Sequence, residues 1–124
     1  MTSFEAVAVT RWQDLPLQQL RGTMSRRFVT SSKLMLAQIN FRKGDVVPAH
    51  RHPNEQFTYV VSGTLRFYFG DDQRSESLVR AGEVVVIPSN LLHSATAIED
   101  TFELDIFSPP RADWIDGSDT YLTG

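Results

Sequence analysis

The sequence predicts an all-β protein that folds as a sandwich or a barrel. Short runs of β-branched and aromatic residues alternate with turn residues from residue 26 to residue 108, and no 3.6-residue hydrophobic period persists there. The length of 124 residues, with 41% hydrophobic and 22% charged residues, is typical of one soluble globular domain. We expect a single domain over 1–124, with an N-terminal arm (about 1–25), a barrel (26–108) and a C-terminal tail (109–124).

The first two dozen residues have mixed character. Trp12, Leu15 and Leu20 indicate a short amphipathic turn or an edge strand, and Pro16 breaks any helix in this region. After them, the spacing of apolar runs and turn residues predicts eight strands, at 26–30, 34–41, 56–61, 64–69, 76–79, 84–87, 93–98 and 102–107. Two prolines then end the strand pattern, and we expect the tail to cover the domain or to contact a second subunit.

Two of these strands differ in their hydrophobic pattern. Leu65, Phe67 and Phe69 alternate with polar or amphipathic residues, which predicts a strand with one buried face. The run from Val84 to Ile87 is apolar on both faces instead. It therefore predicts a central strand that is covered on both sides.

The last strand places acidic and aliphatic residues on opposite faces. Glu103, Asp105 and Phe107 share one face. Leu104 and Ile106 share the other face, and we expect this aliphatic pair to face the core. The acidic face would then point either into a polar pocket or into solvent.

Composition and charge exclude several classes of function. Twelve basic and fifteen acidic residues give a net charge of −3, so no general attraction for nucleic acid or anionic lipid is expected, and we interpret Arg21, Arg26 and Arg27 as solvated. The absence of cysteine excludes disulfides, thiolate metal sites and cysteine nucleophiles. The N-terminus does not resemble a secretory signal, and no apolar run reaches the ~18 residues of a membrane span. We expect a cytoplasmic protein.

All three histidines of the chain fall into one pattern. His50 and His52 are two residues apart, so on an extended chain both imidazoles project to the same side. Gln56 follows a Pro-Asn bend that can return it to the same point, and His93 begins another expected strand. Three imidazoles and one amide oxygen suit a single divalent transition metal such as Zn, Ni, Co, Fe or Mn.

These residues resemble the two motifs of the cupin family. Gly44 to Gly63 matches the first motif, in which five residues separate a glycine from His-x-His, and Gly82 to His93 matches the second, with its Pro and His. The resemblance implies a cupin-type double-stranded β-helix, or jelly-roll barrel. It also implies a metal held by His50, His52, Gln56 and His93, one per chain.

Two positions depart from the family pattern. Gln56 stands where the family commonly has Glu, and Glu55 is one residue too early and should be exposed on the opposite face. A neutral ligand set leaves the full +2 charge on the metal, which favours an anionic ligand. The alternative is that the change weakens metal retention. Asn90 stands where Gly is common, and Asn tolerates the left-handed turn expected there.

A narrower resemblance links the chain to the small pectin-degradation cupins, which convert 4,5-unsaturated monouronates to linear keto forms. By that resemblance Asp105 is the acid/base, Phe107 contacts the sugar ring and Arg111 contacts the substrate carboxylate. Arg111 is equally plausible as a surface residue paired with Asp113 or Asp116. Thr58 shares the Gln56 face, and it either lines the pocket or is a residue chosen for strand propensity. Small cupins are commonly dimers, so a homodimer is expected.

The leading hypothesis is thus a metal-dependent isomerase or lyase-like cupin that acts on a small anionic, sugar-derived substrate. Two alternatives use the same fold: an iron- or manganese-dependent dioxygenase, and a non-catalytic cupin that binds a small ligand. Because histidines must be neutral to bind a metal, we expect metal loss below about pH 6.

Overall fold

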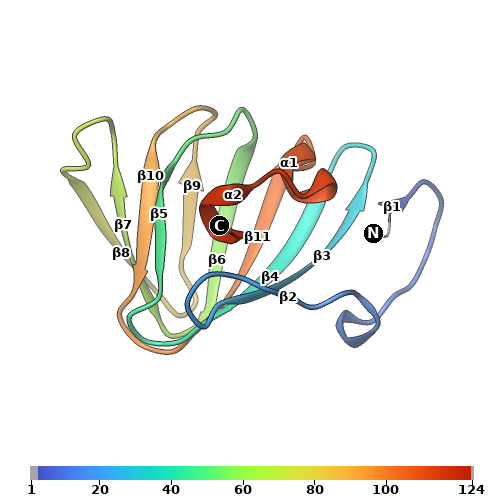
Figure 1. Cartoon of the computed structure of the whole chain (residues 1–124), viewed down its shortest axis with the longest axis horizontal. Helices are drawn as coiled ribbons and strands as arrows, with labels where there is room; N and C mark the ends of the chain where they lie inside the picture. The colour runs from blue at the N-terminus through green and yellow to red at the C-terminus, as the bar shows by residue number, and fades with distance from the viewer. Residues whose placement is uncertain (1–2, 124) are drawn as a thin grey trace.

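The computed structural model describes residues 3–123, and within them the chain forms two facing β-sheets (Figure 1). The larger sheet has seven strands in the order β1-β3-β4-β11-β6-β9, with β2 paired to β3, and the smaller has the order β5-β10-β7-β8. The larger sheet consists of β1 (Ser3–Phe4), β2 (Gln18–Gln19), β3 (Ser25–Ser31), β4 (Met35–Phe41), β6 (Glu55–Ser62), β9 (Val84–Ile87) and β11 (Thr101–Ser108). The smaller sheet consists of β5 (Val46–His50), β7 (Thr64–Phe69), β8 (Ser75–Arg80) and β10 (His93–Ala97).

All eight expected strands are present, with ends that differ by one residue at most, so the all-β prediction is confirmed. Strand β5, which has Pro48 at its centre, is not among the predicted strands. The proline is tolerated because β5 is the outermost strand of its sheet, so the backbone along one edge has no neighbouring strand to which an N–H group would donate. Before Ser25, the chain forms β1, β2 and a 3-10 helix at Trp12–Asp14.

The prediction for strand 84–87 is wrong. Strand β9 ends the larger sheet and pairs only with β6, and the side chains of Val84 and Val86 are 53% and 58% exposed. Only Ile87 is fully buried in this strand. The strand is apolar on both faces because the outer surface of this sheet is itself apolar. From the sequence alone, an apolar outer surface cannot be told apart from a surface that a second layer covers.

The expected orientation of the last strand is also wrong. In β11 the side chains of Glu103, Asp105 and Phe107 are buried, whereas Ile106 is 44% exposed on the outer surface. Leu104 is half-buried on that same surface. The acidic face turns inward because the space between the two sheets holds a polar pocket as well as an apolar core.

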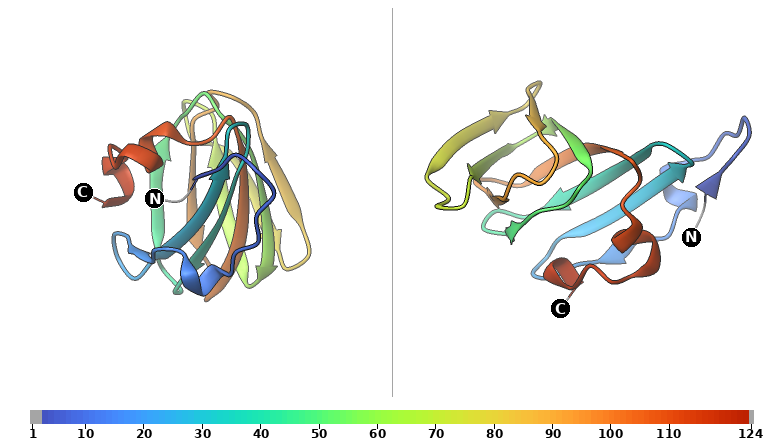
Figure 2. Two further views of the ribbon diagram at one scale, coloured as in Figure 1. Left: turned by 90° about the vertical axis from the view of Figure 1, so that its right-hand side faces the viewer. Right: turned by 90° about the horizontal axis from the view of Figure 1, so that it is seen from above.

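The C-terminal tail covers the inner face of the larger sheet where the smaller sheet does not reach (Figure 2). Helix α1 (Ala112–Asp116) places the Trp114 ring against Phe28 and Phe107, with ring centroids 6.0 and 4.9 Å apart. Helix α2 (Thr120–Thr123) follows. No helix within residues 3–123 is long and apolar enough to cross a membrane.

Arg26 is buried rather than solvated, which corrects the expectation from sequence. Its guanidinium lies 4.2 Å from the centre of the Trp114 ring and forms a buried ion pair with Asp119, at 2.7 Å. The expectation fails because a strand that is exposed in isolation is covered here by a segment more than 80 residues further along the chain. Arg26 thereby ties the tail to β3.

Candidate metal centre

The structure brings the three histidines together at the open end of the two sheets. His50 ends β5 and pairs directly with His93 at the start of the neighbouring strand β10, and His52 follows two residues later. One nitrogen of each ring lies within 4.8 Å of the corresponding nitrogens of the other two. Strand pairing therefore converges three imidazoles on one point, as the spacing predicts.

Each imidazole is oriented by a backbone carbonyl two residues away. The Nδ1 atoms of His50, His52 and His93 lie 2.8, 3.1 and 2.8 Å from the carbonyl oxygens of Pro48, Asn54 and Leu91. A carbonyl only accepts hydrogen bonds, so each Nδ1 carries the proton and each Nε2 presents a lone pair. Such carbonyl partners are typical of histidines that bind metals through the other nitrogen.

The donor set fits a divalent cation. Among the described residues, the buried Nε2 of His93 has no hydrogen-bond partner. The Nε2 of His52 faces Gln56 Oε1 at 3.1 Å, although its Nδ1 already faces the Asn54 carbonyl. A neutral imidazole has one proton, so it can donate to the Asn54 carbonyl or to Gln56 Oε1 but not to both. A cation bound between His52 Nε2 and Gln56 Oε1 would satisfy the two atoms that are left without a proton. The three-histidine cluster is thus a transition-metal site in its chemistry.

Burial keeps these imidazoles neutral. Desolvation, followed by the charge of His93, lowers the pKa of His50 to about 3. Desolvation, followed by the charge of Arg111, lowers the pKa of His52 to about 4, and burial also lowers the pKa of His93. Neutral imidazoles bind metals, and ordinary histidines become protonated below about pH 6. The histidines of this site therefore keep the metal-binding form at a lower pH than ordinary histidines do.

A chain of hydrogen bonds fixes the direction of the Gln56 amide. Thr58 is fully buried and donates its hydroxyl hydrogen to Asp105 Oδ1 at 2.6 Å. The same hydroxyl accepts a hydrogen bond from Gln56 Nε2 at 2.9 Å. The amide nitrogen thus faces Thr58 and the amide oxygen faces the histidines, as a metal ligand requires. Glu55, one residue earlier, is exposed on the other face.

Glu103 is a residue of the site that sequence reasoning did not assign. It is buried beside Asp105 and Thr58, and its Oε2 has no hydrogen-bond partner within residues 3–123. Burial and the neighbouring Asp105 charge raise the pKa of Glu103 well above its ordinary value, and burial also raises the pKa of Asp105. The pair therefore takes up a proton at a higher pH than two separate exposed carboxylates would. The signal available in sequence was the Glu-x-Asp spacing, which puts both acids on one face.

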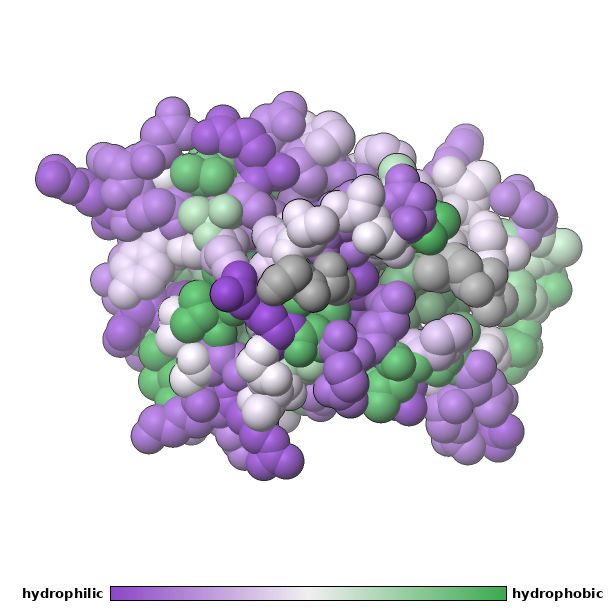
Figure 3. All heavy atoms as spheres, in the orientation of Figure 1, coloured by the Kyte–Doolittle hydropathy of each residue, from purple (hydrophilic) through white to green (hydrophobic). Residues whose placement is uncertain are grey.

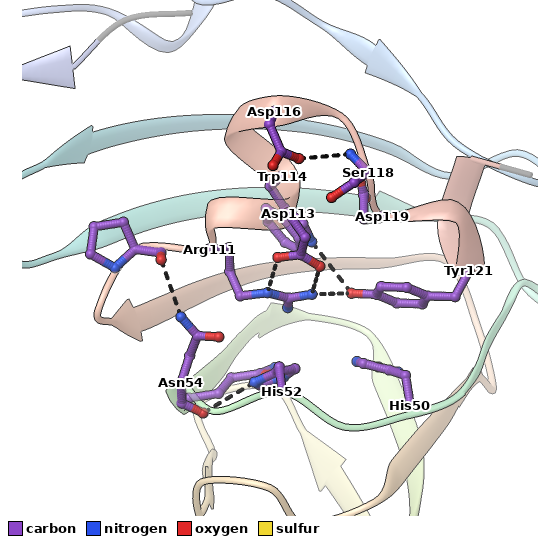
Figure 4. A network of polar contacts seen from close by, with 12 residues as sticks. His50, His52, Asn54, Arg111, Asp113, Trp114, Asp116, Ser118, Asp119 and Tyr121 are labelled. Carbon is purple, nitrogen blue, oxygen red and sulfur yellow. Dashed lines mark hydrogen bonds and ion pairs between the residues drawn. The ribbon is translucent and has the colours of Figure 1, made fainter.

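The tail supplies the remaining wall of the site (Figure 4). The Arg111 guanidinium is buried and holds Asp113 through two hydrogen bonds of 2.9 and 2.7 Å, with a third, of 2.6 Å, to the Tyr121 hydroxyl. The Tyr121 ring stacks on His50 with centroids 4.2 Å apart. The Arg111 guanidinium also lies 5.0 Å from the Phe107 ring. Asp113 is thus the carboxylate that pairs with Arg111.

One pocket joins these groups beneath the tail. Its lining includes His50, Gln56, His93, Glu103, Asp105, Phe107, Arg111 and Tyr121. Thr58 is not part of the lining and lies behind Gln56 and Asp105, which it connects. The pocket therefore combines histidines that can bind a cation, a buried acid pair and a guanidinium.

Comparisons with known proteins agree with this geometry. The model of the cupin domain family matches residues 37–108. The pectin degradation protein KdgF of Dickeya dadantii (strain 3937) is 27% identical over 105 residues, which are 82% of this chain and 93% of the relative. The structure of KdgF from Halomonas sp. has a TM-score of 0.78 and 26% identity over 88% of this chain and 99% of that one. An RmlC-like cupin from Shewanella frigidimarina NCIMB 400 has a TM-score of 0.79 and 23% identity over 89% and 97%.

Proposed function

Because the chain belongs to the cupin domain family, we propose that it is a metal-dependent enzyme that converts 4,5-unsaturated monouronates to their linear keto forms. The observation that carries the proposal is a cluster of three imidazoles, two of which line one pocket together with a buried acid pair that is linked to the cluster through Thr58 and Gln56. The likeness to a pectin degradation protein over most of both chains supports this class of substrate.

The metal would be held by His50, His52, Gln56 and His93. When bound, it supplies Lewis-acid polarisation of a substrate oxygen. The four ligands are neutral, so they leave its positive charge uncompensated and favour a substrate that carries a carboxylate. With four protein ligands, an open position for the substrate would require a metal that takes more than four ligands.

Arg111 would bind the substrate carboxylate. Its guanidinium has the planar fork that suits a carboxylate, and it lies at the pocket wall. In the structure that fork is held by Asp113, whose side chain is 34% exposed, so a substrate carboxylate would bind Arg111 by displacing Asp113. Phe107, whose ring faces both Arg111 and His52, would contact the sugar ring.

Asp105 would move the proton. Ring opening of the cyclic substrate breaks the bond between the ring oxygen and the anomeric carbon. The anomeric carbon becomes an aldehyde, and the proton of its hydroxyl passes to the ring oxygen, which becomes the hydroxyl of an enol. The enol becomes a ketone when one proton passes from oxygen to carbon. No atom is gained or lost. Asp105 takes this proton and returns it. The raised pKa of Glu103 favours its protonated form, which keeps the pair from holding two negative charges.

The test combines activity with metal content. Asp105→Asn should lower the turnover of unsaturated monouronates by about 10²- to 10⁴-fold, as loss of a general acid/base does, while elemental analysis finds the same metal per chain. Glu55→Gln is the matched control, because Glu55 is an exposed acid beside the ligand Gln56 and should be neutral in effect. Full activity in Asp105→Asn would remove Asp105 from the reaction.

Oxygen dependence separates this proposal from the alternatives. Metal-dependent turnover under anaerobic conditions is expected here, whereas a dioxygenase would consume oxygen and stop without it. Tight binding of the monouronate without any turnover by the metal-loaded protein would point to a non-catalytic binding protein instead and would overturn the proposed reaction.

A further inference from the structure

Tyr121 belongs to the site, although it lies outside the part of the chain that matches the cupin domain family. The matched region ends at residue 108, and Tyr121 follows on helix α2 of the tail. Tyr121 nevertheless lines the pocket, and its ring stacks on the His50 imidazole, with centroids 4.2 Å apart and planes 20° apart. The proposed reaction leaves this residue without a part.

The Tyr121 hydroxyl carries a hydrogen that no residue within 3–123 accepts. The oxygen accepts hydrogen bonds from Arg111 Nη2 at 2.6 Å and from Trp114 Nε1 at 3.3 Å. Guanidinium and indole nitrogens only donate, so both bonds use lone pairs of the oxygen and leave its hydrogen uncommitted. A phenol keeps this hydrogen at neutral pH. The Tyr121 side of the pocket therefore offers a hydrogen-bond donor.

This donor lies beside the place where a carboxylate binds Arg111. The Arg111 Nη2 atom donates to Asp113 Oδ2 at 2.7 Å as well as to the Tyr121 hydroxyl (Figure 4). Asp113 thus marks the position of a carboxylate on this fork. A substrate carboxylate that displaces Asp113 would place one oxygen on the same nitrogen, next to the phenol hydroxyl. A carboxylate only accepts hydrogen bonds, so it matches both donors.

The ring of Tyr121 acts on a different part of the site. The Pro48 carbonyl fixes Nδ1 of His50, and Tyr121 covers one face of the same imidazole. Packing of this kind limits the rotation of a metal-binding side chain and keeps its ligand atom directed at the metal position. Tyr121 therefore touches a metal ligand with its ring and the carboxylate site with its hydroxyl.

The tail is anchored by contacts that do not involve the Tyr121 side chain. The backbone N–H of Arg21 donates to the Leu122 carbonyl at 2.7 Å, and the Arg21 guanidinium donates to the Tyr121 carbonyl at 3.3 Å. Leu122 is buried, and Asp119 forms the buried ion pair with Arg26. Figure 3 shows mostly hydrophilic and weakly polar residues over the middle of the face on which Figure 1 places the tail, so the outer side of the tail faces solvent. The side chain of Tyr121 can thus be changed without releasing α2.

We propose that Tyr121 is a substrate-binding and positioning residue: its hydroxyl donates a hydrogen bond to the substrate carboxylate at Arg111, and its ring holds the His50 imidazole toward the metal. This inference rests on the proposed function, which supplies the carboxylate substrate and the metal. It also defines a specificity. The phenol and the guanidinium present only donors and a positive charge, so they bind an acid and bind a neutral ester of the same sugar weakly.

Two variants separate the hydroxyl from the ring. Tyr121→Phe keeps the ring and removes the donor, so KM for unsaturated monouronates should rise about tenfold while kcat stays within about twofold. The metal affinity of Tyr121→Phe, measured by competition with a chelator, should equal that of the wild type. Tyr121→Leu removes the ring as well, so its metal affinity should fall about tenfold in addition, as for other residues that orient ligands. Tyr121→Met replaces Tyr121→Leu if the latter does not fold.

Tyr68 provides the matched control. It is half-buried like Tyr121, but it lies on β7 with its side chain on the opposite face from the buried Leu65 and Phe67, away from the pocket. Tyr68→Phe and Tyr68→Leu should leave KM, kcat and the metal affinity unchanged. Circular dichroism verifies that the variants at both positions fold.

The outcomes separate this inference from the proposed function. A metal-loaded wild type without turnover would refute the reaction and, with it, the carboxylate contact, whereas the metal affinities would still test the ring. An active wild type together with an unchanged KM in Tyr121→Phe would exclude the hydroxyl contact and leave the reaction standing. Equal metal affinity in Tyr121→Leu and wild type would exclude the role of the ring. A lower metal affinity in Tyr121→Phe would overturn the separation of the two roles.

Discussion

Thr58 donates a hydrogen bond of 2.6 Å to Asp105, and through this bond the buried acid pair sets the direction of the Gln56 amide. A hydroxyl whose proton is committed to a carboxylate can only accept from its other neighbour. The amide nitrogen of Gln56 therefore turns toward Thr58, and the amide oxygen turns toward the three histidines. The acid pair and the metal ligands are thus one connected network.

Thr58→Val should disconnect this network. Valine keeps the shape and the strand propensity but removes the hydroxyl, so Gln56 loses its orienting partner and Asp105 loses its donor. We expect metal affinity to fall about 10- to 100-fold, as for other residues that orient ligands, and stability to fall by about 1–3 kcal/mol. Competition with a chelator measures the first and urea unfolding measures the second.

Thr58→Ser should restore most of the affinity, because it keeps the hydroxyl. Thr96→Val is the control, since Thr96 is a half-buried strand residue whose hydroxyl has no hydrogen bond among the described residues. Equal metal affinity in Thr58→Val and wild type would show that Gln56 needs no orienting partner.

Metal binding should stabilise the protein through the histidines. The binding of a metal to the folded state alone adds about 2.7 kcal/mol when its concentration is 100 times its dissociation constant. We expect addition of Zn²⁺ or Mn²⁺ to raise the melting temperature of the metal-free wild type and to leave that of His93→Ala unchanged. An equal rise in both proteins would show that the ion binds elsewhere.

His50 and His52 should remain neutral in the metal-free protein down to about pH 5. Burial lowers the pKa of His50 to about 3 and of His52 to about 4, whereas unfolded histidines titrate near 6.5. Below pH 6.5 the unfolded state binds more protons, so the stability that these groups contribute is complete above pH 6.5 and is lost toward pH 4 and 3. NMR titration of the ring protons checks this, and a midpoint near pH 6.5 for either ring would contradict it.

Glu103 should make stability depend on pH in the opposite direction. Its pKa is raised by burial and by Asp105, so the folded state binds more protons above pH 4.5, and stability falls as the pH rises. Glu103→Gln remains neutral throughout and should remove this loss, which is at most about 1.4 kcal/mol per pH unit for one proton. Urea unfolding of both proteins from pH 5 to 8 measures the difference, and parallel curves would show that Glu103 is ionised when folded.

Local spacing was enough to predict eight of the strands and the histidine cluster. His-x-His places two imidazoles on one side, and a turn through Asn90, which has a φ of +64°, leads into His93 as expected. These features depend on the alternation of side chains along a strand and on residues that are close in sequence. They need no knowledge of what lies across the sheet.

Tertiary structure alone decided which faces are buried. The strand period shows that Glu103, Asp105 and Phe107 share a face, but not that this face is the inner one. The usual criterion, that aliphatic residues face inward, fails for β11 because the interior holds a polar pocket while the outer surface is apolar. Arg26 is buried for a similar reason, since its cover is Trp114 in the distant tail. Burial depends on the segment that packs opposite, and that segment is chosen by the whole fold.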